Sequence, residues 1–219
     1  MDVAIAGGHG KIALHLTRLL RGRGDRVRSL IRNPAHAGDV VAAGGEPVVC
    51  DLEHADEAHV ARAIDGADAV VFAAGAGPGS GPERKWTMDY GGAVKLLAAA
   101  KLDGISRYVM VSSRGADPDA PGDDTFAVYL RAKGRADAEL RASGLAYTIV
   151  RPALLTDDPG TGRISAGEHV DGEHISREDV SAVLAFALHD PALARATFEV
   201  AEGDTPIEQA LAACRPAPA

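Results

Sequence analysis

Three glycines and a lysine separate an apolar run from a helical pattern in the stretch DVAIAGGHGKIALHL, residues 2–16. Apolar residues at positions 3–6 are typical of a short buried strand, and those from Ile12 to Leu20 recur at helical spacing. A glycine turn that joins a strand to a helix lets backbone N–H groups approach a phosphate at the helix start. Such a turn can also join a strand to a helix without binding a ligand. The spacing of its residues therefore has to distinguish a phosphate-binding turn from a structural one.

That spacing distinguishes two classes of phosphate loop. A nucleoside-triphosphate loop needs Ser or Thr after Gly-Lys to hold magnesium, but Ile12 follows Gly10 and Lys11 here. Gly7, Gly10 and Ala13 instead keep the G-x-x-G-x-x-A register of a dinucleotide loop, in which a small third residue lets the helix pack close to the strand. The expected cofactor-binding residues of this loop are Gly7, Gly8, His9, Gly10, Lys11 and Ile12.

The overall charge and the cysteines limit the classes of partner. The 219 residues carry a net charge of −8, which argues against nucleic acid or an anionic membrane as the main partner. Cys50 and Cys214 show no zinc or redox spacing, the histidines form no tight metal pair, and no apolar run approaches membrane-spanning length. We therefore expect a cytoplasmic protein that binds a small molecule, without a metal.

Strand-like and helix-like segments alternate along the rest of the chain. The expected strands are 27–31, 47–50, 69–73, 107–112, 147–151 and 197–200, and the expected helices are 35–43, 56–64, 84–101, 126–143, one that begins at Ser176, and 206–213. This order predicts an α/β fold of the Rossmann type, a doubly wound parallel sheet with helices on both faces. We expect a single domain over 1–219, in which 153–175 (expected to be irregular) and 191–219 form a small substrate-side appendage.

Ligands of such sheets bind beyond the carboxyl ends of the strands, so the residues that follow each strand are candidates. Arg32 follows the second strand, and no carboxylate lies between residues 27 and 38 to accept from a ribose 2′-hydroxyl. A guanidinium pairs with a 2′-phosphate, which predicts NADP(H) in preference to NAD(H), the alternative being an exposed loop charge. The further candidates at strand ends are Asp51, Leu52, Ala73, Ala74, Gly75 and Ser112.

Tyr129 and Lys133 stand four residues apart in VYLRAKGRAD and share one face of the expected helix. A lysine ammonium in this position favours tyrosinate and can bond the nicotinamide ribose, while the phenol gives its proton to a carbonyl oxygen as hydride arrives. Ser113, at the end of the fifth strand, would hold the same oxygen. A Tyr-x-x-x-Lys pair is common by chance, but the strand end and the dinucleotide loop favour Ser113, Tyr129 and Lys133 as catalytic residues.

Taken together, AIAGGHGKIA, LIRNP, VVFAAGAG, the strand end VMVSS, YLRAK and YTIVRPALLTDDPGTGRI resemble the short-chain dehydrogenase/reductase superfamily. The resemblance is to the atypical NAD(P)H-binding branch of NmrA-like and flavin-reductase-like proteins, and it extends over about residues 2–190. It implies pyrophosphate binding at Gly7, Gly10 and Ala13, the 2′-phosphate at Arg32, adenine near Asp51, and a nicotinamide side lined by Ala74 and Gly75 with Ser113, Tyr129 and Lys133 as the catalytic set. It also implies that Pro152 and Ala153 belong to a loop that closes over the nicotinamide.

The resemblance further implies an NADP(H)-dependent oxidoreductase. Because the segments expected to select the substrate, 153–175 and 77–82, are short, a small carbonyl, quinone or flavin-like acceptor is expected rather than a nucleotide-sugar. Two alternatives stay open. One is a non-catalytic NADP(H)-sensing regulatory protein, and the other is an NAD(P)-dependent sugar epimerase or dehydratase. The sequence leaves open whether the protein is a monomer or a homodimer.

Overall fold

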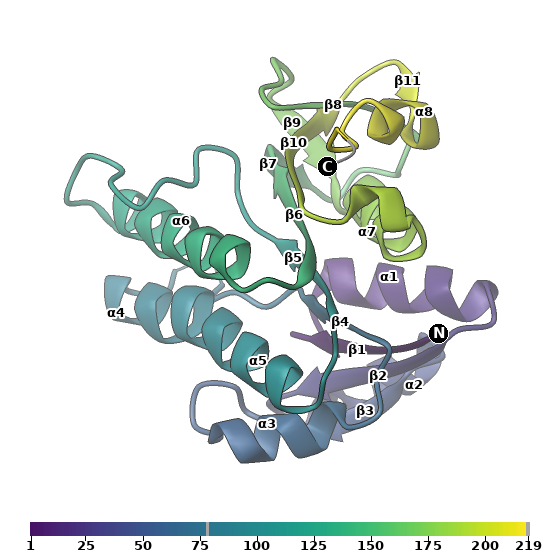
Figure 1. Ribbon diagram of the computed structural model, residues 1–219, viewed down its shortest axis with the longest axis vertical. Coiled ribbons are helices and arrows are strands. Elements are labelled where there is room, and N and C mark those ends of the chain that lie inside the picture. Colours follow the sequence, from purple (N-terminus) through teal and green to yellow (C-terminus); the bar gives the residue numbers. More distant parts are fainter. Residues whose placement is uncertain (78, 218–219) are drawn as a thin grey trace.

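A nine-stranded sheet runs through the computed structural model, which describes residues 1–77 and 79–217 (Figure 1). Its strands are β1 (Asp2–Ala6), β2 (Arg26–Ile31), β3 (Glu46–Val49), β4 (Ala69–Phe72), β5 (Arg107–Val111), β6 (Ala146–Pro152), β8 (Arg163–Gly167), β10 (Ala196–Glu202) and β11 (Thr205–Pro206). They follow the order β11-β8-β10-β6-β5-β4-β1-β2-β3. All neighbours from β3 to β10 pair in parallel, and the β8 pairs are antiparallel.

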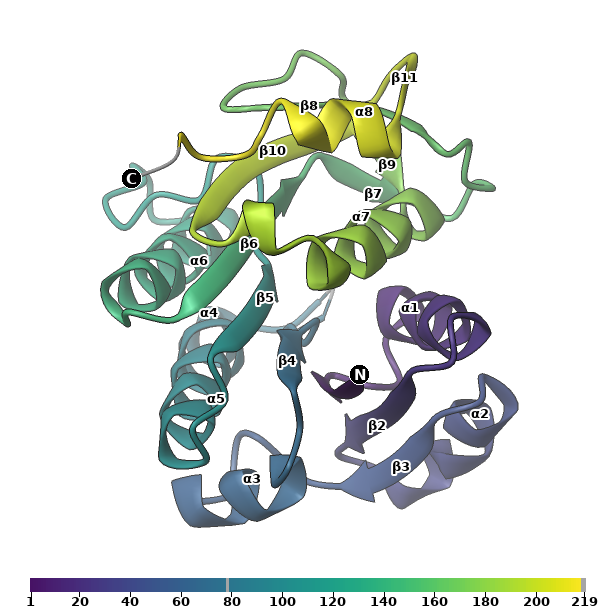
Figure 2. The ribbon, with the colours of Figure 1, turned by 45° about the vertical axis from the view of Figure 1, so that its right-hand side comes forward.

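Helices cover both faces of this sheet (Figures 1 and 2). They are α1 (Lys11–Gly22), α2 (Ala37–Ala42), α3 (Glu57–Ile64), α4 (Pro82–Arg84), α5 (Gly91–Leu102), α6 (Thr125–Ala142), α7 (Arg177–His189) and α8 (Ile207–Ala212). One buried apolar cluster joins α1 and α7 to the sheet through residues such as Leu16 and Leu184. A second cluster on the opposite face joins α3, α5 and α6 through Val60, Leu96 and Leu140. The predicted Rossmann-type fold is therefore confirmed.

Side-chain caps set the start of three helices close to the predicted positions. Asp56 accepts a hydrogen bond from the backbone of His59 at 2.7 Å, and Asp124 caps α6 in the same way. Ser176 accepts from the backbone of Asp179 at 2.9 Å, as the stretch Ser-Arg-Glu-Asp predicts. Each cap satisfies an amide that the helix leaves without a partner, and contributes about 1 kcal/mol.

The predicted helix 84–101 is wrong in one respect, because a π-helical turn interrupts it. The turn, η2 (Lys85–Tyr90), lies between α4 and α5. A wider turn of this kind shifts the side chains that follow it around the helix axis. Here the turn buries Met88 and Asp89, and the spacing of apolar residues does not reveal it.

The expectation of an irregular segment over 153–175 is also wrong in part. This region contains β8, which joins the main sheet, and two short strands, β7 (Leu154–Thr156) and β9 (His174–Ser176), which pair in parallel. Their three to five residues are too few to stand out from the glycine- and aspartate-rich loops between them. Pro78, in the expected substrate loop 77–82, lies outside the described residues.

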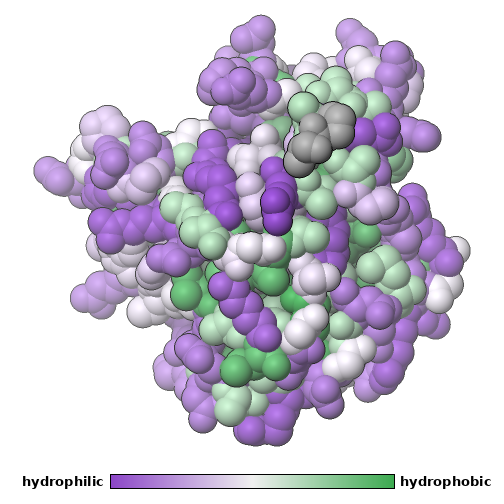
Figure 3. All heavy atoms as spheres, viewed as in Figure 1, coloured by the Kyte–Doolittle hydropathy of each residue, from purple (hydrophilic) through white to green (hydrophobic). Residues whose placement is uncertain are grey.

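The helices of the structure can be compared in length and apolar character with a membrane-spanning helix. Within residues 1–77 and 79–217, none of the helices combines the length and apolar character that a bilayer-crossing segment requires. Charged and polar side chains cover most of the face drawn in Figure 3, and apolar ones gather near its centre.

The glycine turn after β1 lies against the backbone at the ends of neighbouring strands. Gly7 has φ +79°, and a Cβ there would stand 2.6 Å from the Cα of Ala74. A Cβ on Gly8 would stand 2.5 Å from the Cβ of Ser29. Because both distances are far below van der Waals contact, glycine is required at these two positions. The turn thus holds the start of α1 close to the ends of β2 and β4.

Gly7→Ala is expected to lower the free energy of unfolding by about 2–4 kcal/mol, because it combines positive-φ strain with a backbone clash. Urea denaturation monitored by circular dichroism measures the change. The matched control is Gly22→Ala at the end of α1, where an added Cβ meets nothing within 4 Å. The control should be neutral or slightly stabilising. Equal effects of the two substitutions would contradict this account of the turn.

Candidate cofactor and substrate site

Two cavities adjoin at the carboxyl ends of β1, β4, β5 and β6. The larger has a volume of about 760 Å³ and the smaller about 370 Å³. They share four lining residues, which are Ser112, Phe126, Tyr129 and Leu155. Six of the predicted cofactor-binding residues line the larger cavity, namely Ile12, Ala73, Ala74, Gly75, Ser112 and Lys133. Pro152 and Ala153, predicted to contact the cofactor, line only the smaller cavity.

The first turn of α1 is suited to a phosphate. Gly10 is the N-cap residue and supplies no side-chain hydrogen bond to the amides of the first turn, and no acidic residue lies in that turn. These amides carry partial positive charge and need acceptors, which the oxygens of a pyrophosphate provide. The cavity beside them and the small residues of the β4 end fit a dinucleotide that passes from this turn toward Lys133.

The two basic residues of the glycine loop are paired with carboxylates. Lys11 Nζ lies 2.5 Å from Asp157 Oδ2, and Arg177 donates to the other oxygen of Asp157 at 2.7 Å. His9 Nε2 lies 2.8 Å from Asp39 Oδ2. The Lys11 and Arg177 contacts hold the pKa of Asp157 below its ordinary value. Asp157 therefore connects the glycine loop to the start of α7.

Arg32 occupies the predicted place at the end of β2, with a carboxylate beside it. Its guanidinium lies 3.5 Å from Glu53 Oε2, and its side chain is 55% exposed. Glu53 is held more closely by Arg84, at 2.6 Å, and accepts from Thr87. Sequence reasoning searched for an acid only in the segment after β2 and missed Glu53. It comes from the loop after β3, and the parallel pairing of β2 and β3 brings the two strand ends together.

Asp51 and Leu52 order the loop that follows β3. The Asp51 carboxylate accepts from the backbone of Glu53 at 3.0 Å and contacts His54 Nδ1 at 3.0 Å. Leu52 is buried, and its carbonyl accepts from Lys95 at 2.6 Å. The structure thus gives Asp51 a local partner, and its contact with adenine stays a prediction.

Lys133 is buried beneath Tyr129 and held by two oxygens. Its ammonium donates to the carbonyl of Val111 at 3.0 Å and lies 3.5 Å from Asp89 Oδ1. The other oxygen of Asp89 accepts from the backbone of Ala76 at 3.2 Å. Lys133 Nζ lies 5.9 Å from the centroid of the Tyr129 ring. Removing Asp89 would leave a buried ammonium without a counter-charge, which is costly. Sequence reasoning missed Asp89 because the π-helical turn directs it inward.

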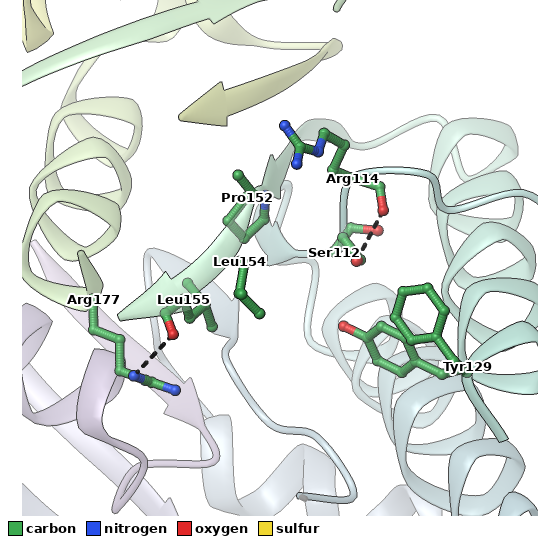
Figure 4. Close-up of a pocket in the computed structure, with 10 residues that line it drawn as sticks. Ser112, Arg114, Tyr129, Pro152, Leu154, Leu155 and Arg177 are labelled. Carbon is green, nitrogen blue, oxygen red and sulfur yellow. Dashed lines mark hydrogen bonds between the residues drawn. The ribbon is translucent and has the colours of Figure 1, made fainter. Parts of the chain in front are cut away.

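Tyr129 and Ser113 share the smaller cavity, and Figure 4 shows the Tyr129 hydroxyl pointing into it. The Tyr129 ring stacks on Phe126 with 6.0 Å between centroids. Ser113 Oγ donates to the carbonyl of Arg114 at 3.1 Å. The structure therefore places Ser113 on the smaller cavity and Lys133 on the larger one, and Tyr129 lines both.

The carboxylate of Asp137 is buried near Ser112, and sequence reasoning did not predict a role for it. Asp137 Oδ2 accepts from Arg151 Nε at 2.9 Å and pairs with Nη2 at 2.8 Å. Burial raises the pKa of Asp137, although Arg151 and the Ser112 hydroxyl act in the opposite direction. Tyr129, Lys133 and Asp137 follow one another at four-residue intervals on α6 and so share one face of the helix.

A family model described as NAD(P)H-binding matches residues 7–191, which include the glycine loop, both cavities and every predicted site residue. The chain belongs to this NAD(P)H-binding family. The resemblance to atypical short-chain dehydrogenases/reductases predicted from the motifs is therefore confirmed. That the larger cavity holds the dinucleotide of this family stays a prediction.

Named relatives and a solved structure extend the comparison over the whole chain. The "Uncharacterized sugar epimerase YhfK" of Bacillus subtilis is 37% identical over 212 residues, which make up 96% of this chain and 99% of the relative. A solved structure from Bacillus halodurans has a TM-score of 0.90 and 37% identity, and the match covers 97% of this chain and 99% of that one. The NAD(P)H azoreductase of Xenophilus azovorans is 27% identical over 154 residues, 70% of this chain and 48% of that enzyme.

Glu53 gives a pH-dependent contribution to stability. Burial raises its pKa, but the hydrogen bonds from Arg84 and Thr87 outweigh burial, so the pKa lies below its ordinary value of 4.5. A carboxylate of this kind stabilises the fold above its unfolded-state pKa, and that contribution is lost as the pH falls through the lower folded-state pKa.

Glu53→Gln should therefore lower the free energy of unfolding by about 1–2 kcal/mol at pH 7, and the loss should shrink below pH 4.5. Urea denaturation at several pH values measures both effects. Glu83→Gln is the control, because Glu83 lies exposed on the neighbouring α4. A loss that stays constant down to pH 3 would contradict the assigned ion pair.

Proposed function

We propose that the protein is an NADP(H)-dependent oxidoreductase that reduces a small carbonyl, quinone or flavin-like acceptor. The observation that carries the proposal is the position of Tyr129, which lines both cavities. Its hydroxyl points into the smaller one, while Lys133 lies on the cofactor side of its ring. A proton donor at the boundary of a cofactor cavity and a substrate cavity is what a carbonyl reductase requires.

The chain would hold the cofactor along the larger cavity. The amides of the first turn of α1 bind the pyrophosphate, small residues at the β4 end let the chain lie close to it, and Lys133 faces the nicotinamide ribose. When bound, NADPH supplies the hydride that is transferred to the acceptor. The match to an NAD(P)H azoreductase agrees with reductase chemistry for this family member.

The residues at the boundary would manage the proton. Tyr129 donates its phenolic proton to the acceptor oxygen, so that hydride and proton together turn a carbonyl into an alcohol. The Lys133 ammonium supplies a positive charge 5.9 Å from the centroid of the Tyr129 ring, and Asp89 with the Val111 carbonyl keeps this ammonium in place. Ser113, on the wall of the smaller cavity, would hold the acceptor oxygen by turning its hydroxyl from the Arg114 carbonyl toward that oxygen.

A preference for NADP(H) is the second part of the proposal. The Arg32 guanidinium is largely exposed at the end of β2 and contacts Glu53 only at 3.5 Å, which leaves it able to turn toward a 2′-phosphate. Glu53 alone would repel that phosphate, but Arg84 at 2.6 Å balances its charge. Asp51 adds a second carboxylate near Arg32, so the proposed preference depends on the Arg32 guanidinium turning toward the 2′-phosphate.

The name of the Bacillus subtilis relative favours a second candidate, sugar epimerisation. An epimerase of this type removes hydride from the substrate and returns it to the opposite face, with no net use of reductant. Stoichiometric NADPH oxidation during turnover distinguishes the reductase from this alternative. The smaller cavity of about 370 Å³ supports a compact acceptor rather than a nucleotide-sugar.

Tyr129→Phe should reduce kcat for NADPH-dependent reduction by about 10²–10⁴-fold, because it removes the proton donor and keeps the ring. The measurement is NADPH absorbance with a panel of aldehydes, quinones and flavins, together with a cofactor titration that should change by less than about twofold. Tyr147→Phe, on β6 and outside the lining of either cavity, is the control. Unchanged turnover in Tyr129→Phe would refute the assigned role.

Arg32→Asp should weaken NADPH binding by at least about 10–100-fold and change NADH binding by less than about threefold, because only NADPH carries the 2′-phosphate. Fluorescence titration with both nucleotides measures the two affinities. Arg18→Asp, at an exposed position of α1, introduces the same charge change away from the site. Equal losses for the two nucleotides in Arg32→Asp would remove Arg32 from the 2′-phosphate.

A further inference from the structure

The smaller cavity combines an apolar wall with two guanidinium groups. Pro152, Leu154 and Leu155 form part of the wall, and Arg114 and Arg177 supply the charges (Figure 4). Among the described residues that line it, none is acidic. In a chain with a net charge of −8, a cavity with only positive charges on its wall favours an anionic ligand.

The two arginines differ in what already binds them. Arg177 Nη1 donates to Asp157 at 2.7 Å, so its charge is paired. Arg114 has no carboxylate within 4 Å in the described part of the chain, and Nη1 donates to the backbone carbonyls of Val170 and Gly172. Arg114 is therefore the guanidinium of this cavity whose charge is available to a ligand.

The hydrogen bonds of Arg114 leave one particular edge available. A guanidinium has five N–H donors, and the two on Nη1 point at carbonyl oxygens. Nε and Nη2 have no acceptor within the described residues. These atoms form the side of the guanidinium that binds both oxygens of a carboxylate through parallel hydrogen bonds. The two carbonyls hold the guanidinium in place before a ligand arrives, which reduces the entropy lost on binding.

The rest of the cavity suits an apolar body. Phe126 and Leu154 line it and are among the most exposed large apolar residues described, with 63% and 66% of their surface accessible. Phe126 stacks on Tyr129, so a flat ring system beside them would cover apolar surface from both. The exposed apolar area on this wall matches a conjugated or aromatic acceptor rather than a sugar.

We propose that the acceptor is a flat, apolar carbonyl compound that carries a carboxylate, and that Arg114 binds this carboxylate through Nε and Nη2. The proposal rests on the reductase function proposed above. Arg114 directly follows Ser113 in the chain, so one short segment would bind the anionic end of the acceptor and hold its reacting oxygen. Arg114 thereby selects acidic acceptors over neutral ones of the same shape.

A binding experiment tests the anion site without turnover. The probes are 2-naphthoate and its neutral counterpart 2-naphthamide, titrated by calorimetry into the full chain saturated with NADP⁺, which occupies the phosphate-binding groups of the cofactor site. The unsubstituted protein should bind naphthoate about 10–100-fold more tightly than naphthamide. Arg114→Gln should remove this preference by weakening naphthoate alone. An unsubstituted protein that binds both probes equally overturns the proposal.

A matched control separates ligand binding from loop support. Arg131 Nη1 also donates to two backbone carbonyls, those of Ala120 and Gly122, but Arg131 lines neither cavity. Arg131→Gln should therefore keep the preference for naphthoate. Arg114→Lys keeps the charge without the paired donors, and should retain a preference of less than about tenfold. If Arg114→Gln fails to fold, Arg114→Lys and the unsubstituted protein decide the question.

Turnover separates this proposal from the function on which it rests. The acceptors are 4-formylbenzoate and 4-formylbenzamide, followed by NADPH oxidation. The expected result is a lower KM for the acid, which Arg114→Gln raises about 10–100-fold, whereas Arg131→Gln leaves the KM of both aldehydes unchanged. Reduction of both aldehydes with equal KM overturns the anion site and leaves the reductase. Binding of naphthoate that depends on Arg114, without reduction of any acceptor, supports the anion site and overturns the reductase.

Discussion

The close approach of the glycine turn to the ends of its neighbouring strands is the constraint on which the site depends. With Gly7 against Ala74 and Gly8 against Ser29, the start of α1 is held where the chain reverses its direction of winding between β1 and β4. Loops diverge at such a reversal and leave a crevice that side chains do not fill. The larger cavity lies in this crevice, and the π-helical turn and α6 form its far wall. Backbone packing, rather than any catalytic side chain, therefore sets where a dinucleotide can lie.

Electrostatic pairing distinguishes the two sides of the site. On the cofactor side the charged candidates already have carboxylate partners, which are Asp39 for His9, Asp157 for Lys11, Glu53 for Arg32 and Asp89 for Lys133. The exposed pairs of Lys11 and Arg32 exchange partners readily because each contributes little in water, whereas the pair of Lys133 and Asp89 is buried and fixed. On the substrate side Arg114 contacts only carbonyl oxygens. The site therefore has exchangeable charges at the glycine loop and at the end of β2, a fixed pair on the larger cavity, and in Arg114 a guanidinium on the smaller cavity with no carboxylate partner among the described residues.

Most of the fold and about half of the site could be predicted from the sequence, because both depend on local patterns. Strands of the parallel sheet, the caps at Asp56 and Ser176, and the shared face of Tyr129 and Lys133 all follow from spacing within one element. The carboxylates that complete the site could not be found in this way, and they are Glu53, Asp89, Asp137 and Asp157. Each reaches its partner from a different element, namely a loop for Glu53 and Asp157, the π-helical turn for Asp89 and helix α6 for Asp137, and a pattern within one element contains no information on such contacts. The short strands β7 and β9 were missed because three residues give no periodicity.

One face of helix α6 carries two of the proposed catalytic residues and the buried carboxylate of Asp137. Tyr129, Lys133 and Asp137 lie one above another on α6, so their spacing along the helix axis is fixed by the helix itself, about 6 Å for each four-residue step. Insertion of a single residue within α6 between its cap at Asp124 and Tyr129 would rotate Tyr129 and Lys133 by about 100° and turn both from the larger cavity. The loops around the smaller cavity can therefore change in length, whereas the number of helical residues between Asp124 and Tyr129 has to be kept or changed by whole turns.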